Sequence, residues 1–436
     1  MTADAARAMN QLFPEGELFT YSFYGYAIVN LHLMGNEAER RELQAAPKLA
    51  RLIARIEGLR GAPPFAENAT LTPEGGIIFA GQLNLLRAGY LLAGGEAATI
   101  RERFRTASSE LAHAFVDAPV PALESYPGLV WPVDSICALA SLAHYERLIG
   151  GGLPPAVEAW QRWTTASLDA RTGMPPAQIT GAGLQVEVPR GCALSWMLAF
   201  APDFAPELSR RLYDRFRREW WSDYGLVAGF REWPVGYAAG GMDSDTGPII
   251  GGIGAAATGF GLAASRVNGD SRTHRRILRQ IELFGLPAHD TSGHKTYFFG
   301  AVLLPEILIL WGRTVTPWVA AIADPLAPTS THLAGGGDGG LQVGVAVTAS
   351  VVLLLGCAWS AVSCLRRLAG ARQWPTGFGY GVLAGHVVVI AAWLGFGWLR
   401  WFEAMAPMLL LECVEARLAA HRCRAAPDAA GRGQLA

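Results

Sequence analysis

The first 315 residues alternate between two kinds of predicted helix, and this alternation constrains the fold more than any other feature. Helices that are apolar around most of their circumference are expected at 18–34, 77–94, 133–149, 190–201, 248–266 and 296–312. Charged amphipathic helices are expected at 37–58, 96–116, 155–170, 204–221 and 271–284. Successive apolar helices are spaced about 50–60 residues apart, which indicates a repeated helical pair.

A helix that is apolar on all sides must be buried on all sides, whereas an amphipathic helix keeps one face in water. The pattern therefore predicts an all-α fold in which an inner ring of six helices lies within an outer ring, an (α/α)6 toroid over residues 1–315. The N-terminal residues are the candidate for the sixth outer helix. An open helical solenoid is the alternative, but the pairs stop at six where the composition changes, and this favours the closed ring.

The sequence after residue 315 predicts a linker followed by membrane-spanning segments. Residues 316–340 are rich in Pro, Gly, Ala and Thr and are expected to be a linker. Two long apolar runs, Leu341 to Leu365 and Gly377 to Leu399, predict a C-terminal transmembrane helical hairpin within residues 341–400. Residues 401–436 are expected to be amphipathic at first and then disordered.

These features predict a two-pass membrane protein whose toroid lies in the cytoplasm. Residues 1–13 lack the basic start, apolar run and cleavage site of a secretory signal. The connector between the spans carries Arg366, Arg367 and Arg372, which by the positive-inside rule favours the opposite orientation. Basic residues in the tail favour a cytoplasmic C-terminus, and we expect both termini there.

Charge and cysteine content limit the function classes. A net charge of -1 gives no basis for nucleic-acid binding, which needs a basic surface. The six cysteines form no C-x-x-C pair and do not lie near spaced histidines, so neither a metal site nor a disulfide framework is supported. We expect no cofactor.

Loops that precede the inner helices of such a ring gather at one mouth, and here they carry chemically active side chains. Asp134, together with Asp243 or Asp245, is the candidate acid–base pair. If burial raises the pKa of one carboxyl group, that group can protonate a leaving hydroxyl or glycosidic oxygen while the other stabilises a cation or activates water. The alternative is that Asp134 is an N-cap or first-turn carboxylate at the positive end of its helix, and that one of the other two caps a helix.

Other residues of these loops are candidates for substrate binding. Arg190 begins an inner helix and is expected either to pair with Glu187 or to bind an anion. Cys192 lies near the same helix N-terminus, which lowers a thiol pKa, or it is an ordinary core residue. Aromatic rings would suit either sugar rings or an isoprenoid cation. The full set of binding candidates is Gln82, Glu124, Tyr126, Trp131, Arg190, Cys192, Arg231, Glu232, Trp233 and His289.

Several short segments, in order and at matching spacing, resemble one known family. They include Phe23-Tyr24-Gly25-Tyr26, Gly81-Gln82-Leu83-Asn84-Leu85, Asp134-Ser135, Trp196 and Arg231-Glu232. Over residues 18–312 the chain resembles the linalool dehydratase-isomerase family. The resemblance implies an α6/α6 barrel and cofactor-free dehydration and isomerisation of a terpene alcohol, with Tyr24 and Tyr26 positioning or polarising the hydroxyl.

The chain also departs from that family at chemically important positions. Gln82 stands where the family has a histidine, and an amide is neither a general acid nor a general base near neutral pH. Val133 stands where the family has a cysteine, and the family's upstream Cys-Glu is only loosely matched by Glu124. The resemblance therefore implies the fold but not the linalool reaction itself.

Together with the apolar C-terminal runs, the resemblance implies a membrane-bound, linalool dehydratase-isomerase-like lyase or isomerase that acts by cofactor-free acid–base chemistry. Its expected substrate is small, hydrophobic and hydroxylated, either terpenoid or lipid-like. Membrane lipid is the other expected partner, nucleic acid is not, and homo-oligomer formation is left open. One alternative is a hydrolase or lyase acting on glycans, which rests on fold analogy alone. The other is a binding protein without catalytic activity.

Overall fold

A computed structural model describes residues 2–225, 227–237, 241–289, 293–297, 300 and 302–318. The chain separates into two units, Met1–Ala327 and Pro328–Ala436, and the described residues all belong to the first. The expected transmembrane hairpin and tail lie outside the described residues, as does nearly all of the expected linker. Within the described ranges, none of the helices combines the length and the apolar character needed to cross a bilayer.

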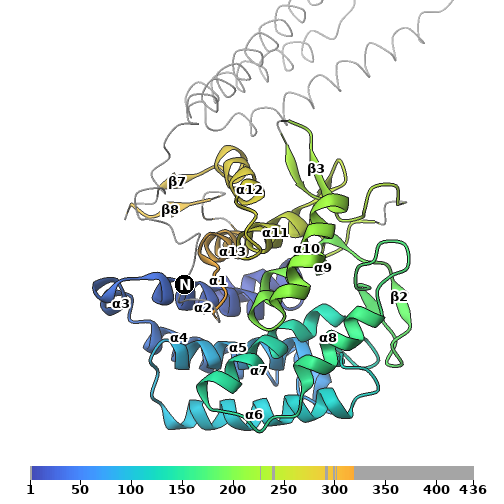
Figure 1. The fold of residues 1–436 in the computed structure, drawn as a ribbon. Coiled ribbons are helices and arrows are strands. Elements are labelled where there is room, and N and C mark those ends of the chain that lie inside the picture. The colour runs from blue at the N-terminus through green and yellow to red at the C-terminus, as the bar shows by residue number, and fades with distance from the viewer. Residues whose placement is uncertain are drawn as a thin grey trace, which may run out of the picture. The chain divides into compact units, whose positions relative to one another are not determined.

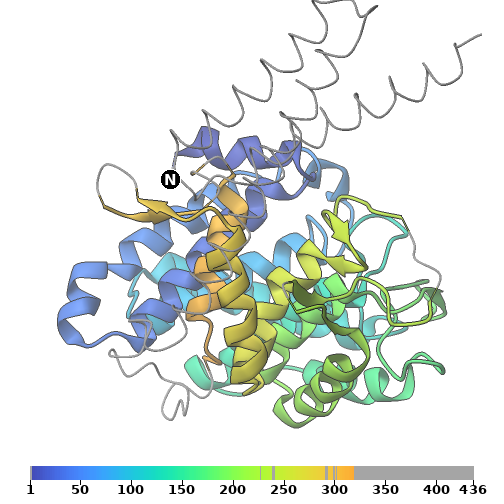
Figure 2. The same cartoon turned by 90° about the horizontal axis from the view of Figure 1, so that it is seen from above.

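Six helices from positions spread along the first unit contact one another in a closed order. They are α2 (Gly16–Met34), α5 (Ile77–Leu92), α7 (Ile136–Leu148), α9 (Gly191–Phe200), α11 (Ala255–Val267) and α13 (Leu303–Thr314). Each contacts the next, and the last, α13, contacts the first, α2 (Figures 1 and 2). The expectation of a helix-rich fold is confirmed.

A second set of helices packs outside these six. It comprises α3 (Glu37–Leu43), α4 (Ala45–Glu57), α6 (Ala98–Asp117), α8 (Ala156–Ala166), α10 (Pro206–Trp220) and α12 (Ser271–Phe284). The charged helix expected at 37–58 is divided into α3 and α4, because Gln44 between them adopts the left-handed conformation with φ 47°. In Figure 1, α6 and α12 lie on opposite sides of this unit.

The N-terminal residues form only α1 (Ala3–Arg7) and the short 3-10 helix η1 (Ala8–Gln11). They nevertheless lie beside the last helix, since α1 contacts α13 and the backbone N–H of Leu304 donates to the sulfur of Met9 at 3.4 Å. The remaining 3-10 helices are η2 (Phe65–Asn68), η3 (Pro132–Ser135) and η4 (Ala201–Asp203).

Short antiparallel hairpins interrupt the helices. They pair β1 (Gln178–Ile179) with β2 (Gln185–Glu187), β3 (Trp221–Asp223) with β4 (Ala228–Phe230), β5 (Ile249–Ile250) with β6 (Ile253–Gly254), and β7 (Ala288–His289) with β8 (Lys295–Thr296). Two predicted inner helices therefore begin later than expected, at 255 and 303. Gly251 and Gly252, at φ 58° and 84°, form the tight turn of the β5–β6 hairpin, a conformation that only glycine adopts readily.

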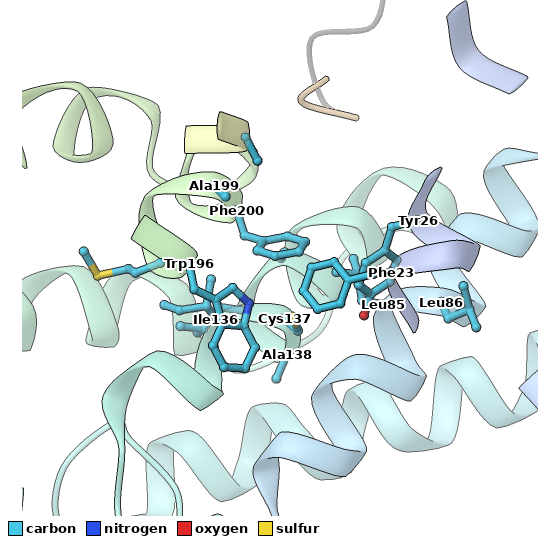
Figure 3. Packing of buried hydrophobic residues seen from close by; sticks show 14 of the residues in the cluster. Phe23, Tyr26, Leu85, Leu86, Ile136, Cys137, Ala138, Trp196, Ala199 and Phe200 are labelled. Carbon is cyan, nitrogen blue, oxygen red and sulfur yellow. The ribbon is translucent and has the colours of Figure 1, made fainter. Parts of the chain in front are cut away.

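Aromatic side chains fill the centre between the six helices. Phe23 on α2 contacts Phe200, Phe260 and Trp311 with ring centroids 6.2, 5.6 and 4.7 Å apart. Figure 3 shows part of this core, with Trp196 and Phe200 facing Phe23. Such burial of large rings is the main stabilisation of a core of this kind.

The end of the described unit is fixed to its beginning. Trp318, four residues beyond α13, is buried and its indole N–H donates to the side-chain oxygen of Asn30 on α2 at 2.7 Å. The same ring lies against His144 of α7, with centroids 5.2 Å apart. Trp318 therefore links the end of α13 to both α2 and α7.

Candidate functional site

A pocket of about 1050 Å³ lies where α2, α9, α11, α12 and α13 meet the loops 126–134 and 242–254. Its polar lining residues are Glu15, Tyr126, Trp131, Asp134, Glu187, Arg190, Cys192, Asp243, Ser244, Asp245, Thr258 and Gln280. Seven residues predicted from the sequence thus meet in one cavity: Tyr126, Trp131, Asp134, Arg190, Cys192, Asp243 and Asp245.

Asp134 is the most deeply buried carboxyl group of the pocket. It belongs to η3, is 7% exposed, and accepts a 2.5 Å hydrogen bond from the hydroxyl of Ser125. Its pKa is raised to about 8: burial raises it most, the Ser125 bond lowers it, and the charges of Glu15 and Asp245 add to the increase. Its side chain makes no capping hydrogen bond to η3 or α7, but Asp134 does lie in the first turn of η3, which the helix-terminus interpretation allowed.

Glu15 is a site residue that the sequence analysis missed. It immediately precedes α2, is half-buried, and accepts a hydrogen bond from the phenolic hydroxyl of Tyr126. Burial raises the pKa of Glu15, although the Tyr126 bond lowers it. A signal was present, because Glu15 precedes its inner helix in much the same way as Asp134 precedes α7.

The two carboxylates of loop 243–245 differ in their surroundings. Asp243 Oδ1 accepts from the backbone N–H groups of Asp245 and Thr246, both at 3.0 Å, and its Oδ2 accepts from Arg190 at 2.7 Å. Asp243 is therefore occupied in shaping the loop rather than capping a helix. Asp245 lies at the pocket surface, where loss of water around its carboxylate and then the charge of Asp243 raise its pKa.

Behind the lining, Glu232 joins Arg190 to Cys192. The carboxylate of Glu232 is fully buried and accepts from Arg190 Nε at 2.9 Å, from the Cys192 thiol at 3.0 Å and from the Cys192 backbone N–H at 3.2 Å. Arg190 also reaches Glu187 at 3.3 Å. Burial and the adjacent Glu232 raise the pKa of Cys192, which favours the ordinary buried residue over the alternative of a thiol pKa lowered by the helix terminus.

Three expected site residues of the first two inner helices lie away from the lining. Tyr26 is buried in the core, where its hydroxyl donates to the backbone oxygen of Gln82 at 3.0 Å (Figure 3). Gln82 is itself 1% exposed, and Tyr24 is half-buried against the core. Successive residues of a helix point in different directions, and in a helix that is apolar on all sides the sequence pattern does not show which of them faces a cavity.

Four further candidates also lie off the lining. Glu124 binds the backbone N–H of Gly128 at 3.2 Å, and Arg231 binds the hydroxyl of Tyr224 at 3.0 Å. Trp233 is buried, and the guanidinium carbon of Arg190 lies 5.2 Å from the centroid of the Trp233 ring. His289 is exposed in β7. Trp233 and Glu232 therefore support the site from behind.

An aromatic wall continues from the acidic residues into the pocket. Phe19 on α2 contacts Trp196 on α9 with centroids 5.1 Å apart, and Trp196 stacks on Phe260 of α11 at 5.8 Å. All three rings line the cavity. Such a wall can bind a hydrocarbon and can stabilise a cation over the ring faces.

Among the described residues, no cluster of three or more His, Cys, Asp or Glu is arranged to hold a metal ion. A comparison of the sequence with protein-family models and with curated proteins finds no match. The site must therefore be interpreted from its own geometry.

Proposed function

We propose that this chain is an acid–base lyase or isomerase that acts on a hydrophobic, hydroxylated substrate of terpenoid or lipid-like character. The observation that carries the proposal is Asp134, a carboxyl group protonated near neutral pH by burial, at the edge of an aromatic-walled pocket. A protonated carboxyl group in an apolar site is a general acid suited to a poor leaving group such as hydroxide.

The proposed reaction needs one proton donor and one proton acceptor. Asp134 would protonate the substrate hydroxyl, and cleavage of the C–O bond would release water and leave an allylic cation. The faces of Phe19, Trp196 and Phe260 would stabilise this cation. Asp245 or Glu15 in its ionised form would then remove a proton from a neighbouring carbon, which yields an alkene. Re-addition of water at another carbon would give isomerisation instead.

The lining favours this substrate class over a glycan. Hydroxyl groups along a sugar chain need polar partners along its length, whereas here the acidic groups interact with one another at one part of the pocket. Asp134, Glu15 and Asp245 line the same pocket, and the charges of Glu15 and Asp245 both raise the pKa of Asp134. An amphiphile with a single polar end fits this distribution.

We further propose that the closed order of six helices and their outer partners is an (α/α)6 toroid of the linalool dehydratase-isomerase type. The ring of contacts from α2 through α13 and back to α2 supports this fold. The position of the pocket supports it too, because loops that precede α7 and α11 both contribute acids.

The test is turnover by the full-length chain in detergent, with tertiary allylic terpene alcohols as probes and products followed by gas chromatography. Wild-type protein should form alkenes or an isomeric alcohol, and Asp134→Asn should form neither. Ser265→Ala is the matched control, because Ser265 is a buried helical serine whose hydroxyl donates to the backbone oxygen of Leu262 in the same helix at 2.9 Å, and it lies off the pocket. Undiminished turnover by Asp134→Asn would overturn the proposal.

A further inference from the structure

We propose that the pocket is built for a substrate with a long hydrocarbon tail, of fifteen carbons or more, whose chain runs between α11, α12 and α13. The inference rests on the proposed function for the position of the hydroxyl group beside Asp134. The proposed function leaves open whether the substrate is a short terpene or a long-chain lipid, and the inference selects the long chain.

The part of the pocket between these three helices is lined by aliphatic and aromatic side chains. Those of α12 are Ile277, Ile281 and Phe284, and those of α13 are Leu304, Leu308 and Ile309. Each methylene group of a ligand that leaves water for such a surface strengthens binding through the hydrophobic effect. This surface is continuous with the acidic end of the same cavity.

The two polar side chains of this region are already bound to backbone. Gln280 accepts from the N–H of Ala228 at 2.6 Å. The Thr258 hydroxyl accepts from the N–H of Phe230 at 3.1 Å and lies 3.3 Å from its carbonyl oxygen, to which it donates. The Gln280 oxygen and the Thr258 hydroxyl are thus engaged by the β3–β4 hairpin, and the aliphatic and aromatic side chains of α12 and α13 favour a ligand without polar groups along this stretch.

The size of the cavity excludes a short terpene as its full occupant. Its volume of about 1050 Å³ lies at the upper end of the range of about 300–1000 Å³ for small-molecule sites. A chain carbon occupies roughly the volume of a water molecule in the liquid, about 30 Å³. A ten-carbon alcohol therefore fills only about a third of the cavity, and the remainder suits a longer chain.

Gly259 identifies the open space within the helical wall. This residue of α11 lines the pocket, and a Cβ atom built on it meets nothing within 4 Å. At Gly261 of the same helix a Cβ atom would lie 2.3 Å from the ring of Phe230. A side chain at position 259 would therefore project into unoccupied space and shorten the pocket without displacing the core.

The experiment measures binding and turnover against chain length in full-length protein. Alcohols of ten, fifteen and twenty carbons compete with a fluorescent long-chain alcohol, and dissociation constants are compared for wild type, Gly259→Leu and Gly259→Trp. Gly61→Leu is the control, since a Cβ at Gly61 also meets nothing within 4 Å and Gly61 lies off the pocket. We expect wild-type affinity to rise with chain length, by about tenfold or more from ten to twenty carbons.

In the Gly259 variants this gain should disappear while binding of the ten-carbon alcohol is retained, and Gly61→Leu should behave as wild type. Wild-type affinity that does not depend on chain length, or a gain that survives Gly259→Trp, would overturn the tail assignment. Failure of the chemistry is a separate result, because the binding series supports the tail assignment even if none of the alcohols is turned over.

Discussion

The hydroxyl of Ser125 donates a 2.5 Å hydrogen bond to Asp134 Oδ2, and this bond opposes the effect of burial on the same carboxyl group. Burial removes water from the charged form and raises the pKa, whereas a donated hydrogen bond stabilises the charged form. Burial is the larger effect, and the pKa is raised from 3.8 to about 8. The pKa of Asp134 is therefore set mainly by burial, and Ser125 reduces the increase.

Asp134→Asn should abolish turnover without loss of stability at neutral pH. The raised pKa means that the contribution of Asp134 to stability is fully present below 3.8 and is lost as pH rises through about 8. The neutral amide does not titrate, so at pH 7 the variant should be more stable than wild type, by at most about 4 kcal/mol. Urea unfolding between pH 4 and 8.5 measures this. Equal pH dependence in both proteins would contradict the assignment.

Ser125→Ala should move the alkaline limit of activity upward. Removal of a bond that favours the ionised form raises the pKa of Asp134 above about 8, so the acid stays protonated to higher pH. The pH dependence of kcat/KM should show its falling limb displaced to higher pH, with Ser265→Ala unchanged. A limb that stays in place, or moves to lower pH, would show that another group titrates there.

The pair Arg190 and Glu232 should be strongly coupled. Arg190→Met leaves a fully buried carboxylate without its guanidinium and should cost about 3–5 kcal/mol of unfolding free energy. Glu232→Gln added to Arg190→Met should restore much of that loss, because the amide needs no counter-charge. A double-mutant cycle by chemical denaturation tests this, and additive losses would argue against the pair.

Two glycines of α11 should respond in opposite directions to the same substitution. Gly261→Ala should destabilise the protein by about 1–3 kcal/mol, because its Cβ would lie 2.3 Å from the ring of Phe230. Gly259→Ala should be neutral or stabilising by up to about 1 kcal/mol, since alanine favours the helix and meets nothing within 4 Å. Thermal unfolding of the two variants provides the comparison, and an equal loss in both would contradict it.

Helical pairing was predictable from the sequence because burial dictates it. The apolar helices at 77–94 and 133–149 correspond closely to α5 and to η3 with α7. The start of α11 was not predictable in the same way. Residues 248–254 are apolar enough for a helix, but Gly251 and Gly252 turn them into a hairpin, and hydrophobicity alone does not distinguish the two.

Some residues of the candidate site were predictable from the sequence, and others were not. Asp134 and Asp245 precede buried helices, a position that the repeat pattern identifies, and both line the pocket. Tyr26 lies within a helix buried on all sides, so its direction depends on packing, and it faces the core. Glu15 also precedes a buried helix, but its partner Tyr126 is 111 residues away, and a contact over such a separation leaves no local pattern that assigns it to the site.

The contact of α13 with α2 has a consequence for how this domain unfolds. In an open array of repeats each unit touches only its neighbours, so terminal repeats can fray one at a time. Here the helix that would be terminal is adjacent to the first, and Trp318 is bonded to Asn30 across that junction. Loss of one helix exposes two neighbours rather than one. Melting should therefore be a single cooperative transition, and an exposed loop such as 150–155 should tolerate proteolytic nicking without release of either fragment.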